Sequence, residues 1–335
     1  MTGRPVSVEP ARLDWTEGGQ PWSDRFADIY HTIDGGLGQS RHVFLEGASV
    51  AARWRGRETF TILETGFGLG VNFLAAWDRL RADPAGPARL HFVSCERHPL
   101  TREDLERALA PFDELRSLAG ALVTAWPPLL EGVHRIHFDG GRVILTLAFG
   151  DARTWMPQLD LAADAFFLDG FSPSRNPELW SPEIVRELAR LASTGATLAT
   201  WTIASGVRAA LAGAGFRLER REGFGHKREM LSGVYEGEAR ATPTPAKEAI
   251  VVGGGLSGIL VADRLASRGV AVTLVEPRER RANARAGLVR PVANVRDAMN
   301  AQLSRPAFLY ALQHYANLQR EGFHLLWDRC GVLQL

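Results

Sequence analysis

Cysteine is scarce in this sequence, and long apolar runs are absent. The two cysteines, Cys95 and Cys330, are too few for a disulfide framework, and neither lies in a CxxC or Cys/His pattern spaced for zinc. The longest apolar stretch, Ala249 to Ala262, is short and interrupted by glycine, and residues 1–15 contain no segment of signal-peptide type. We therefore expect no metal centre, no membrane span and a reducing, cytoplasmic location.

The sequence also lacks a strong net charge. Its formal charge is +1, from 39 basic and 38 acidic residues, which excludes a uniformly basic nucleic-acid binder but allows a local basic patch. With 45% hydrophobic and 23% charged residues, the composition is that of a folded globular protein. At 335 residues the chain exceeds one average domain, so we expect two modules.

Short β-rich apolar runs alternate with segments of helical period between Thr59 and Tyr235. This alternation predicts an α/β fold with a mostly parallel sheet covered by helices. The expected strands are Phe60–Thr65, Leu90–Cys95, Val143–Phe149, Ala165–Asp169, Ala196–Thr200, Phe216–Glu219 and Met230–Tyr235. Arg135–Phe138 and Arg142–Leu147, joined by Asp-Gly-Gly, predict an inserted hairpin.

The pattern predicts a domain over residues 1–237, a linker over 238–248 and a second module over 249–335. The linker is poor in large apolar residues and contains two prolines. At Ala249 the strand, glycine loop and helix pattern begins again.

A glycine-rich loop follows the first expected strand, in the segment ETGFGLGVN. Gly66, Gly68 and Gly70 alternate, so backbone N–H groups and a helix N-terminus can approach a polar ligand closely. The spacing differs from the dinucleotide pattern G-x-G-x-x-G and suits the methionine half of S-adenosylmethionine better than a pyrophosphate. We therefore predict a Rossmann-like class I methyltransferase domain, with Glu64 and Asn72 among its cofactor-binding residues.

Two acids at later strand ends extend this cofactor site. Glu96 ends the next strand, where a carboxylate can accept hydrogen bonds from both ribose hydroxyls. Asp151 follows another strand and could reach the adenine amino group, although an aspartate there is also a common helix N-cap.

The segment LDGFSPSRNPELW ends an apolar strand with Asp169 and continues through a stiff, aromatic loop. Such a loop at a strand's carboxyl end is where an open α/β sheet holds its substrate, here with Phe171 and Pro173. An alkylamine with a pKa near the lysine value of about 10.4 is mostly protonated at neutral pH. We predict that Asp169 anchors and orients such an amine; alternatively, it is a turn residue beside ordinary core aromatics.

Basic residues cluster around the late hairpin. Lys227 and Arg228 follow the flexible Gly-Phe-Gly-His segment and could contact phosphates, although nearby glutamates offset their charge and a solvated face is an alternative.

The second module opens with a dinucleotide fingerprint. Gly253, Gly255 and Gly258 supply G-x-G-x-x-G, and Glu276 closes the following strand where a ribose acid is expected. The pattern predicts nucleotide binding without separating FAD from NAD.

The motifs together resemble the MnmC family of bifunctional tRNA wobble-uridine modification proteins. The matching blocks are WSDRFADIYHTIDGGLGQSRHVFLEG, ETGFGLGVNFL, LHFVSCERHPLT, LDGFSPSRNPELW and GFGHKREMLSGVYEG. The resemblance implies a tRNA substrate, methylation of the amine of 5-aminomethyl-(2-thio)uridine, and FAD in the second module.

The resemblance also implies an FAD-dependent removal of the carboxymethyl group from 5-carboxymethylaminomethyl-uridine. Because residues 249–335 are much shorter than the family's oxidase half, we expect an incomplete FAD-binding βαβ module with weak flavin binding and no oxidase activity. We also expect parts of Val251–Val261 and Phe323–Trp327 to be exposed. Two other readings stay open: a methyltransferase for a small-molecule or protein amine, and a non-catalytic tRNA-binding module.

Overall fold

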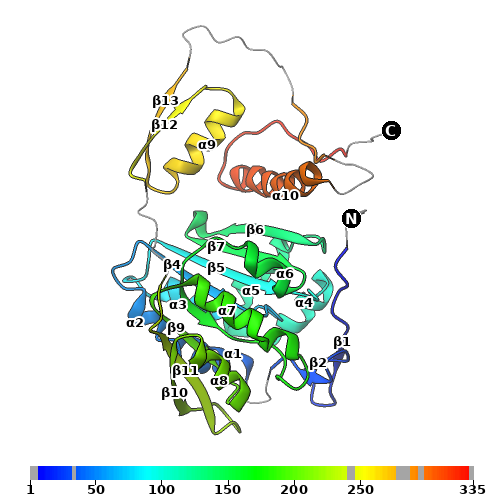
Figure 1. Cartoon of the computed structure of the whole chain (residues 1–335). Coiled ribbons are helices and arrows are strands. Elements are labelled where there is room, and N and C mark those ends of the chain that lie inside the picture. Colours follow the sequence, from blue (N-terminus) through cyan, green and yellow to red (C-terminus); the bar gives the residue numbers. More distant parts are fainter. Residues whose placement is uncertain (1–6, 32–34, 240–245, 277–286, 293–297, 332–335) are drawn as a thin grey trace. The chain divides into compact units, whose positions relative to one another are not determined.

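A computed structural model describes residues 7–31, 35–239, 246–276, 287–292 and 298–331. The chain divides into two compact units, one made of residues 1–241 and 291–335, the other of residues 242–290. The prediction of an α/β fold is confirmed, since the first unit is built on an eight-stranded, mostly parallel sheet (Figure 1).

The large sheet has the strand order β10-β11-β9-β8-β4-β5-β7-β6. The five central strands β9, β8, β4, β5 and β7 run parallel. At one end of the sheet β6 pairs antiparallel with β7, and at the other end β11 pairs antiparallel with both β9 and β10. Their bounds are β4 Thr59–Glu64, β5 Arg89–Glu96, β6 Gly132–Phe138, β7 Val143–Phe149, β8 Ala163–Phe167, β9 Ala192–Thr200, β10 Phe216–Glu222 and β11 Glu229–Tyr235. The carboxyl ends of the parallel strands therefore meet at one edge.

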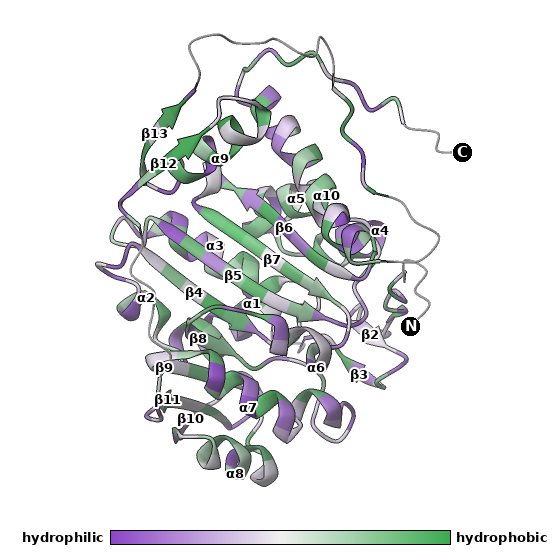
Figure 2. Cartoon of the chain, turned by 45° about the horizontal axis from the view of Figure 1, so that its top comes forward, coloured by the Kyte–Doolittle hydropathy of each residue, from purple (hydrophilic) through white to green (hydrophobic). Residues whose placement is uncertain are grey.

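Helices cover both faces of this sheet, which explains why its central parallel strands are mostly buried and apolar. Ile62 packs into one buried cluster while its neighbour Leu63 packs into the other, as expected for a strand whose side chains alternate. Figure 2 shows the hydrophobic residues along β4, β5 and β7. One face carries α3 (Val71–Ala82), α4 (Arg102–Leu109) and α5 (Arg116–Ala125), and the other carries α6 (Ala152–Trp155), α7 (Pro182–Leu191) and α8 (Ser205–Gly213).

The predicted hairpin is confirmed as the β6–β7 pair, in which Phe138 faces Val143. Its turn is the 3-10 helix η3 (Asp139–Gly141), whose three residues all have positive φ, at 48°, 63° and 90°. The indole of Trp77 donates to the Asp139 carboxylate at 2.6 Å, which fixes the turn to α3. The first strand begins at Gly132, earlier than the sequence indicated.

Short elements before β4 were not assigned from the sequence. A three-stranded meander contains β1 (Leu13–Trp15), β2 (Pro21–Ser23) and β3 (Asp28–Ile29). It is followed by α1 (Gly36–Gln39), the π-helix η1 (Ser40–Glu46) and α2 (Val50–Arg53). The remaining single turns of 3-10 helix are η2 (Asp113–Leu115), η4 (Met156–Gln158) and η5 (Pro177–Trp180).

The second unit contains a parallel pair, β12 (Glu248–Val252) and β13 (Ala271–Val275), connected by α9 (Leu256–Ala266). The expected strand, glycine loop, helix and strand are therefore present. Residues 240–245 of the expected linker lie outside the described residues. The long helix α10 (Met299–Arg320) belongs to the first unit. None of the helices in the described part of the chain has the length and hydrophobicity of a membrane span.

Large apolar side chains of the second unit are exposed, as the sequence predicted. Ile250 is 73% exposed, Val252 82% and Leu256 67%, whereas Ile62 and Leu63 of β4 are fully buried. Phe323 and Leu326 in the first unit are also exposed. Because burial of apolar area is the main source of stability, we expect β12 and β13 to be less stable than β4 and β5.

This difference predicts the pattern of amide hydrogen exchange in the full chain. We expect the amides of β12 and β13 to exchange roughly 10²-fold faster or more than those of β4 and β5, because opening free energies within a protein range from near zero to the global stability. Mass spectrometry of peptic peptides measures both regions in one sample. Equal protection of the two sheets would contradict the assignment of a weakly packed second unit.

Candidate active site

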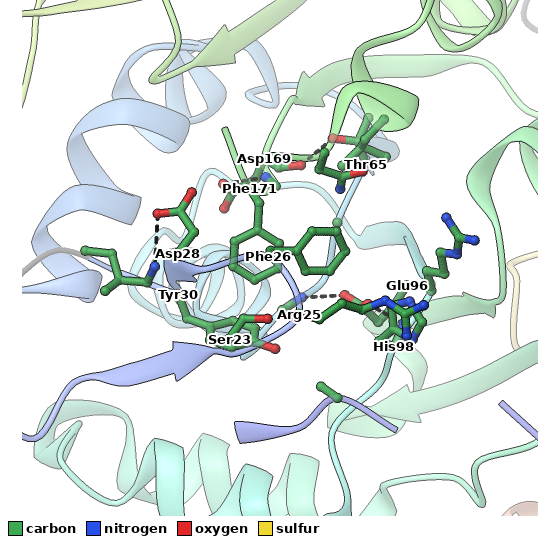
Figure 3. Close-up of a pocket in the computed structure, with 18 of the residues that line it drawn as sticks. Ser23, Arg25, Phe26, Asp28, Tyr30, Thr65, Glu96, His98, Asp169 and Phe171 are labelled. Atoms are coloured by element: carbon green, nitrogen blue, oxygen red, sulfur yellow. Dashed lines mark hydrogen bonds between the residues drawn. The ribbon is translucent and has the colours of Figure 1, made fainter. Parts of the chain in front are cut away.

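A cavity of the first unit lies at the carboxyl edge of the large sheet and has a volume of about 740 Å³ (Figure 3). Its floor is formed by residues that follow the ends of parallel strands, and its cover comes from the meander and from the loop after β8. Site residues that the sequence predicted and that line the cavity are Gly66, Gly68, Glu96, Asp151, Asp169, Phe171 and Lys227. The topology therefore brings together residues from distant parts of the chain.

The glycine loop has the backbone geometry of a ligand cradle. Gly68 and Gly70 adopt positive φ, at 53° and 74°, and Gly70 is the N-cap residue of α3. A Cβ on Gly66 would lie 3.2 Å from the carbonyl oxygen of Asp169, and one on Gly68 would lie 3.6 Å from the ring of Tyr30, which lines the cavity. Side chains at these two positions would fill the space between the loop and its cover, so the loop fits a ligand that contacts backbone.

Glu96, the last residue of β5, ties this loop to the cavity wall. Its carboxylate accepts hydrogen bonds from the backbone N–H of Gly68 at 2.9 Å and of His98 at 2.8 Å. Burial raises the pKa of Glu96, and these backbone donors partly offset the increase. Each carboxylate oxygen has a second lone pair, so the residue can still accept hydrogen bonds from a ribose diol.

Asp151 occupies the N-cap position that the sequence offered as one of two alternatives, and it also lines the cavity. At the start of α6 its side chain accepts from the backbone N–H of Arg153 at 2.9 Å. Hydrogen bonds from the Arg153 side chain hold the pKa of Asp151 below its ordinary value. Asp151 is therefore a paired carboxylate at the cavity wall, and its contact with adenine stays a prediction.

Asp169, two residues after β8, is held by donors from three segments. One carboxylate oxygen accepts from the backbone N–H of Gly170 at 2.8 Å and from the indole of Trp201 at 3.2 Å, and the other accepts from the amide of Asn72 at 2.7 Å. Burial raises the pKa of Asp169, and these hydrogen bonds act in the opposite direction. The result is an oriented carboxylate that faces the cavity (Figure 3).

The loop after Asp169 supplies an aromatic wall. Phe171 stacks on Phe26 of the meander with ring centroids 4.5 Å apart, and the ring of Tyr30 meets it edge-on at 5.1 Å. Trp180 donates its indole hydrogen to the Phe171 carbonyl at 2.9 Å, which closes the loop on itself. Pro173 lies in this loop but outside the described cavity lining.

Lys227 is the basic residue of the late hairpin that reaches the cavity. Its ammonium nitrogen lies 3.2 Å from the ring centroid of Trp201, a cation–π arrangement. Desolvation lowers the pKa of Lys227 to about 8, although the carboxylates of Asp28 and Asp169 act in the opposite direction. Arg228 is not part of the described cavity lining, so the structure separates the two predicted substrate-binding cations.

Glu64 and Asn72, both predicted to bind cofactor, lie behind the cavity wall. Glu64 is fully buried and Asn72 is 6% exposed, and neither is among the described residues that line the cavity. The Asn72 amide donates to Glu64 at 2.9 Å as well as to Asp169.

In the second unit, the residues of the glycine fingerprint lie close to one another and to Glu276. Gly253 has φ of 107°, a Cβ on Gly254 would lie 1.9 Å from a carboxylate oxygen of Glu276, and one on Gly258 would lie 1.8 Å from the Gly253 carbonyl oxygen. The loop and the predicted ribose acid are therefore adjacent, as a bound nucleotide requires. Within the described residues there is no cluster of three or more His, Cys, Asp or Glu side chains suited to a metal ion.

Several residues that line the cavity were not predicted as site residues, among them Phe26, Asp28, Tyr30 and Trp201. The first three lie in the block DRFADIYHT, which carried part of the family resemblance, but no periodicity linked that block to the sheet. Trp201 follows the carboxyl end of a predicted strand, so the rule that located Asp169 could also have located it.

Comparison with known families defines the class of each segment. Residues 113–236 match the model of an S-adenosyl-L-methionine-dependent methyltransferase family, and residues 248–335 match that of an FAD-dependent oxidoreductase family. The expected cofactor classes are thus supported. The first match contains Asp151, Asp169 and Lys227, whereas the glycine loop and Glu96 precede it.

Curated relatives identify the family. The chain is 50% identical to the tRNA 5-methylaminomethyl-2-thiouridine biosynthesis bifunctional protein MnmC of Aromatoleum aromaticum and to that of Azoarcus sp. strain BH72, over 98% of this chain and 53% of each relative. By sequence the chain belongs to the MnmC family, and it spans about half the length of these relatives. The fold also resembles the crystal structure of MNMC2 from Aquifex aeolicus, with a TM-score of 0.54, 23% identity and coverage of 71% of this chain and 73% of that one.

The glycine cradle predicts the effect of a Gly68→Asn substitution. Asparagine tolerates positive φ, so the fold should be kept while the new side chain fills ligand space. We expect the affinity for S-adenosylmethionine, measured by calorimetry, to fall about 10²-fold or more, a loss of at least ~2.7 kcal/mol. Gly120→Ala, at a helical position with no atom within 4 Å of the new Cβ, is the matched control and should bind normally. Normal binding by Gly68→Asn would show that the cofactor lies elsewhere.

Proposed function

We propose that residues 1–237 methylate the primary amine of 5-aminomethyl-(2-thio)uridine at the wobble position of tRNA, using S-adenosylmethionine, to give 5-methylaminomethyl-(2-thio)uridine. The observation that carries this proposal is the Asp169 carboxylate, held in one orientation at the cavity beside the glycine loop. The MnmC relatives support tRNA as the partner. We also propose a cytoplasmic location.

S-adenosylmethionine held at the Gly66–Gly70 loop would supply an electrophilic methyl group to the amine lone pair, with the electron pair of the broken carbon–sulfur bond leaving on sulfur. The residues of this chain have to present that lone pair. Asp169 would bind the substrate ammonium, accept its proton or pass it to water, and keep the free amine oriented. Since only the ionised carboxylate performs this step, and burial raises its pKa, methylation should decline as the pH falls through that raised value.

The binding roles follow the cavity wall. We propose that Gly66, Gly68 and Gly70 hold the methionine part of the cofactor, that Glu96 binds the ribose hydroxyls, and that Asp151 approaches the adenine. Phe171, with Pro173 in the same loop, would contact the uridine. Lys227 and Arg228 would contact the tRNA backbone, Lys227 from inside the cavity and Arg228 from outside it.

Two rival functions would use the same cavity differently. A methyltransferase for a small-molecule or protein amine needs the cofactor site and Asp169 but no RNA, and a tRNA-binding module needs no methyl transfer. Incubation with methyl-labelled S-adenosylmethionine and, separately, bulk tRNA, a protein extract and a metabolite extract distinguishes them. We expect label in tRNA alone; label in another fraction, or in none, would overturn the proposed substrate.

Asp169→Asn tests the proposed catalytic residue. The amide keeps the size of the side chain but cannot carry the negative charge or accept the proton, so the methylation rate should fall by about 10²- to 10⁴-fold. Affinity for S-adenosylmethionine should change little. Glu106→Gln, at an exposed position on α4, is a matched control and should leave the rate unchanged. A normal rate in Asp169→Asn would make Asp169 a structural turn residue.

We propose further that Gly253, Gly255, Gly258 and Glu276 hold the adenosine-diphosphate end of FAD. The match to an FAD-dependent oxidoreductase family and the closeness of Glu276 to the loop support this assignment. Flavin oxidation also needs a site that holds the ring and excludes bulk water. The exposed apolar side chains of β12 and α9 provide no such enclosure among the described residues.

We therefore expect this chain to bind FAD weakly and not to oxidise tRNA. Incubation with added FAD and tRNA that carries 5-carboxymethylaminomethyl-uridine, followed by mass spectrometry of the nucleosides, measures the reaction. The starting nucleoside should persist. Appearance of 5-aminomethyl- or 5-methylaminomethyl-uridine would contradict the expectation.

A further inference from the structure

Asn72 uses its whole side chain to connect two carboxyl groups. Its amide nitrogen donates to Glu64 at 2.9 Å and to Asp169 at 2.7 Å, while its oxygen accepts from the hydroxyl of Ser40 at 2.6 Å. An amide nitrogen has two hydrogens and no lone pair to offer, so both hydrogens are used. The opposite amide orientation would point an oxygen at two carboxyl groups, which makes the observed orientation the stable one.

The second carboxylate oxygen of Glu64 is also held by a hydrogen bond. It accepts from the hydroxyl of Ser94 at 2.8 Å. Glu64, Ser94 and Ser40 are fully buried and Asn72 nearly so, and none of the four lines the cavity among the described residues. These hydrogen bonds thus occupy the polar ends of Glu64 and Asn72 inside the protein, leaving them little capacity to bind a ligand directly.

The connection spans segments that the sequence keeps far apart. Ser40 begins the π-helix η1, Glu64 ends β4, Asn72 lies in the first turn of α3, and Ser94 lies in β5. A π-helical turn contains an extra residue, and such turns occur often at functional sites. Here the π-helix brings a buried hydroxyl to the amide that supports Asp169.

We infer that Glu64 and Asn72 are positioning residues for the amine-binding carboxylate of Asp169, rather than contacts of S-adenosylmethionine. This inference rests on the proposed function of the cavity and assigns a different role to two residues whose place in the sequence motif suggests cofactor binding. Glu64 sets the rotation of the Asn72 amide, and that amide restrains the Asp169 oxygen that Gly170 and Trp201 do not hold.

The positioning role also affects the charge of Asp169. A hydrogen bond from Asn72 stabilises the ionised carboxylate, so its loss should raise the pKa of Asp169. Two other titratable groups interact with Asp169. One is Glu64, whose own pKa is raised mainly by burial and to a smaller extent by Asp169, and the other is Lys227, which lowers the pKa of Asp169. Glu96 acts on Glu64, and Asp28 acts on Lys227. All of these remain when Asn72 alone is changed.

The test compares Asn72→Leu with the wild-type chain. Leucine has a similar size but donates no hydrogen bond. We expect the affinity for S-adenosylmethionine to stay within about threefold, a difference of ~0.7 kcal/mol. The kcat for methylation should fall by about 10- to 100-fold, the cost of misplacing a reacting group. The acidic limb of the pH–rate profile should move to higher pH.

A second readout does not depend on activity. In a chain labelled with 5-fluorotryptophan and carrying Lys227→Met, which removes the ammonium lying on the same ring, the ¹⁹F signal of Trp201, assigned with Trp201→Phe, reports the ionisation of Asp169 through the indole hydrogen bond. Its midpoint should be higher when Asn72→Leu is added than in the chain that carries Lys227→Met alone. If that variant does not fold, Ser40→Ala, which removes only the donor to the Asn72 oxygen, should shift the midpoint and the rate in the same directions by a smaller factor.

The outcomes separate this inference from the proposed function. Loss of cofactor affinity by the same factor as the rate, with an unchanged Trp201 titration, would make Asn72 a cofactor contact and overturn the inference. A wild-type chain that methylates no tRNA would overturn the proposed substrate instead, and the Trp201 titration would still report whether Asn72 supports Asp169.

Discussion

The desolvation free energy of carboxyl groups at the edge of a closely packed sheet determines how the residues of this site are arranged. Four adjacent parallel strands, β8, β4, β5 and β7, are each ended or followed within two residues by an acid, so the sheet brings these acids to one edge. The acids are Glu64, Glu96, Asp151 and Asp169. A carboxylate removed from water is tolerated only when donors replace its hydration, and each of the four accepts hydrogen bonds from nearby backbone or side chains.

The donors give the four acids different properties although they share one edge. Asp151 has arginine partners, and its pKa is lowered. Glu64 is fully buried and accepts hydrogen bonds from the neutral side chains of Asn72 and Ser94, and its pKa is raised well above the ordinary value. Glu96 and Asp169 lie between these extremes and face the cavity. The same strand-end position can therefore provide a structural cap, a buried support or a ligand-binding carboxylate, depending on which donors surround it.

Much of the fold followed from local patterns in the sequence. Apolar runs located the parallel strands, Asp-Gly-Gly located the β6–β7 turn, and alternating glycines located the loop before α3, because each depends on residues close together in the chain. The meander and the π-helix have no comparable pattern. The meander reaches the cavity through the contact of Phe26 with Phe171, and the π-helix supports it from behind through that of Ser40 with Asn72. Both contacts join residues far apart in the sequence.

The site residues show the same division. Asp169 and Glu96 were found by position, since ligands gather where parallel strands end. Glu64 and Asn72 belong to the glycine motif by sequence, but their hydrogen bonds connect them to Asp169, and no spacing rule indicates that. Lys227 and Arg228 are neighbours in the sequence, yet only Lys227 lies on Trp201 within the described cavity lining.

The most direct measurement is a crystal structure of the chain with S-adenosylhomocysteine and an anticodon stem-loop that carries 5-aminomethyl-uridine. We expect the substrate amine within about 3.2 Å of an Asp169 carboxylate oxygen, a hydrogen-bonding distance. We also expect the cofactor on the Gly66–Gly70 loop and Asn72 still hydrogen-bonded to Glu64. An amine bound away from Asp169, or a cofactor hydrogen-bonded to Asn72, would contradict the proposed roles of these residues.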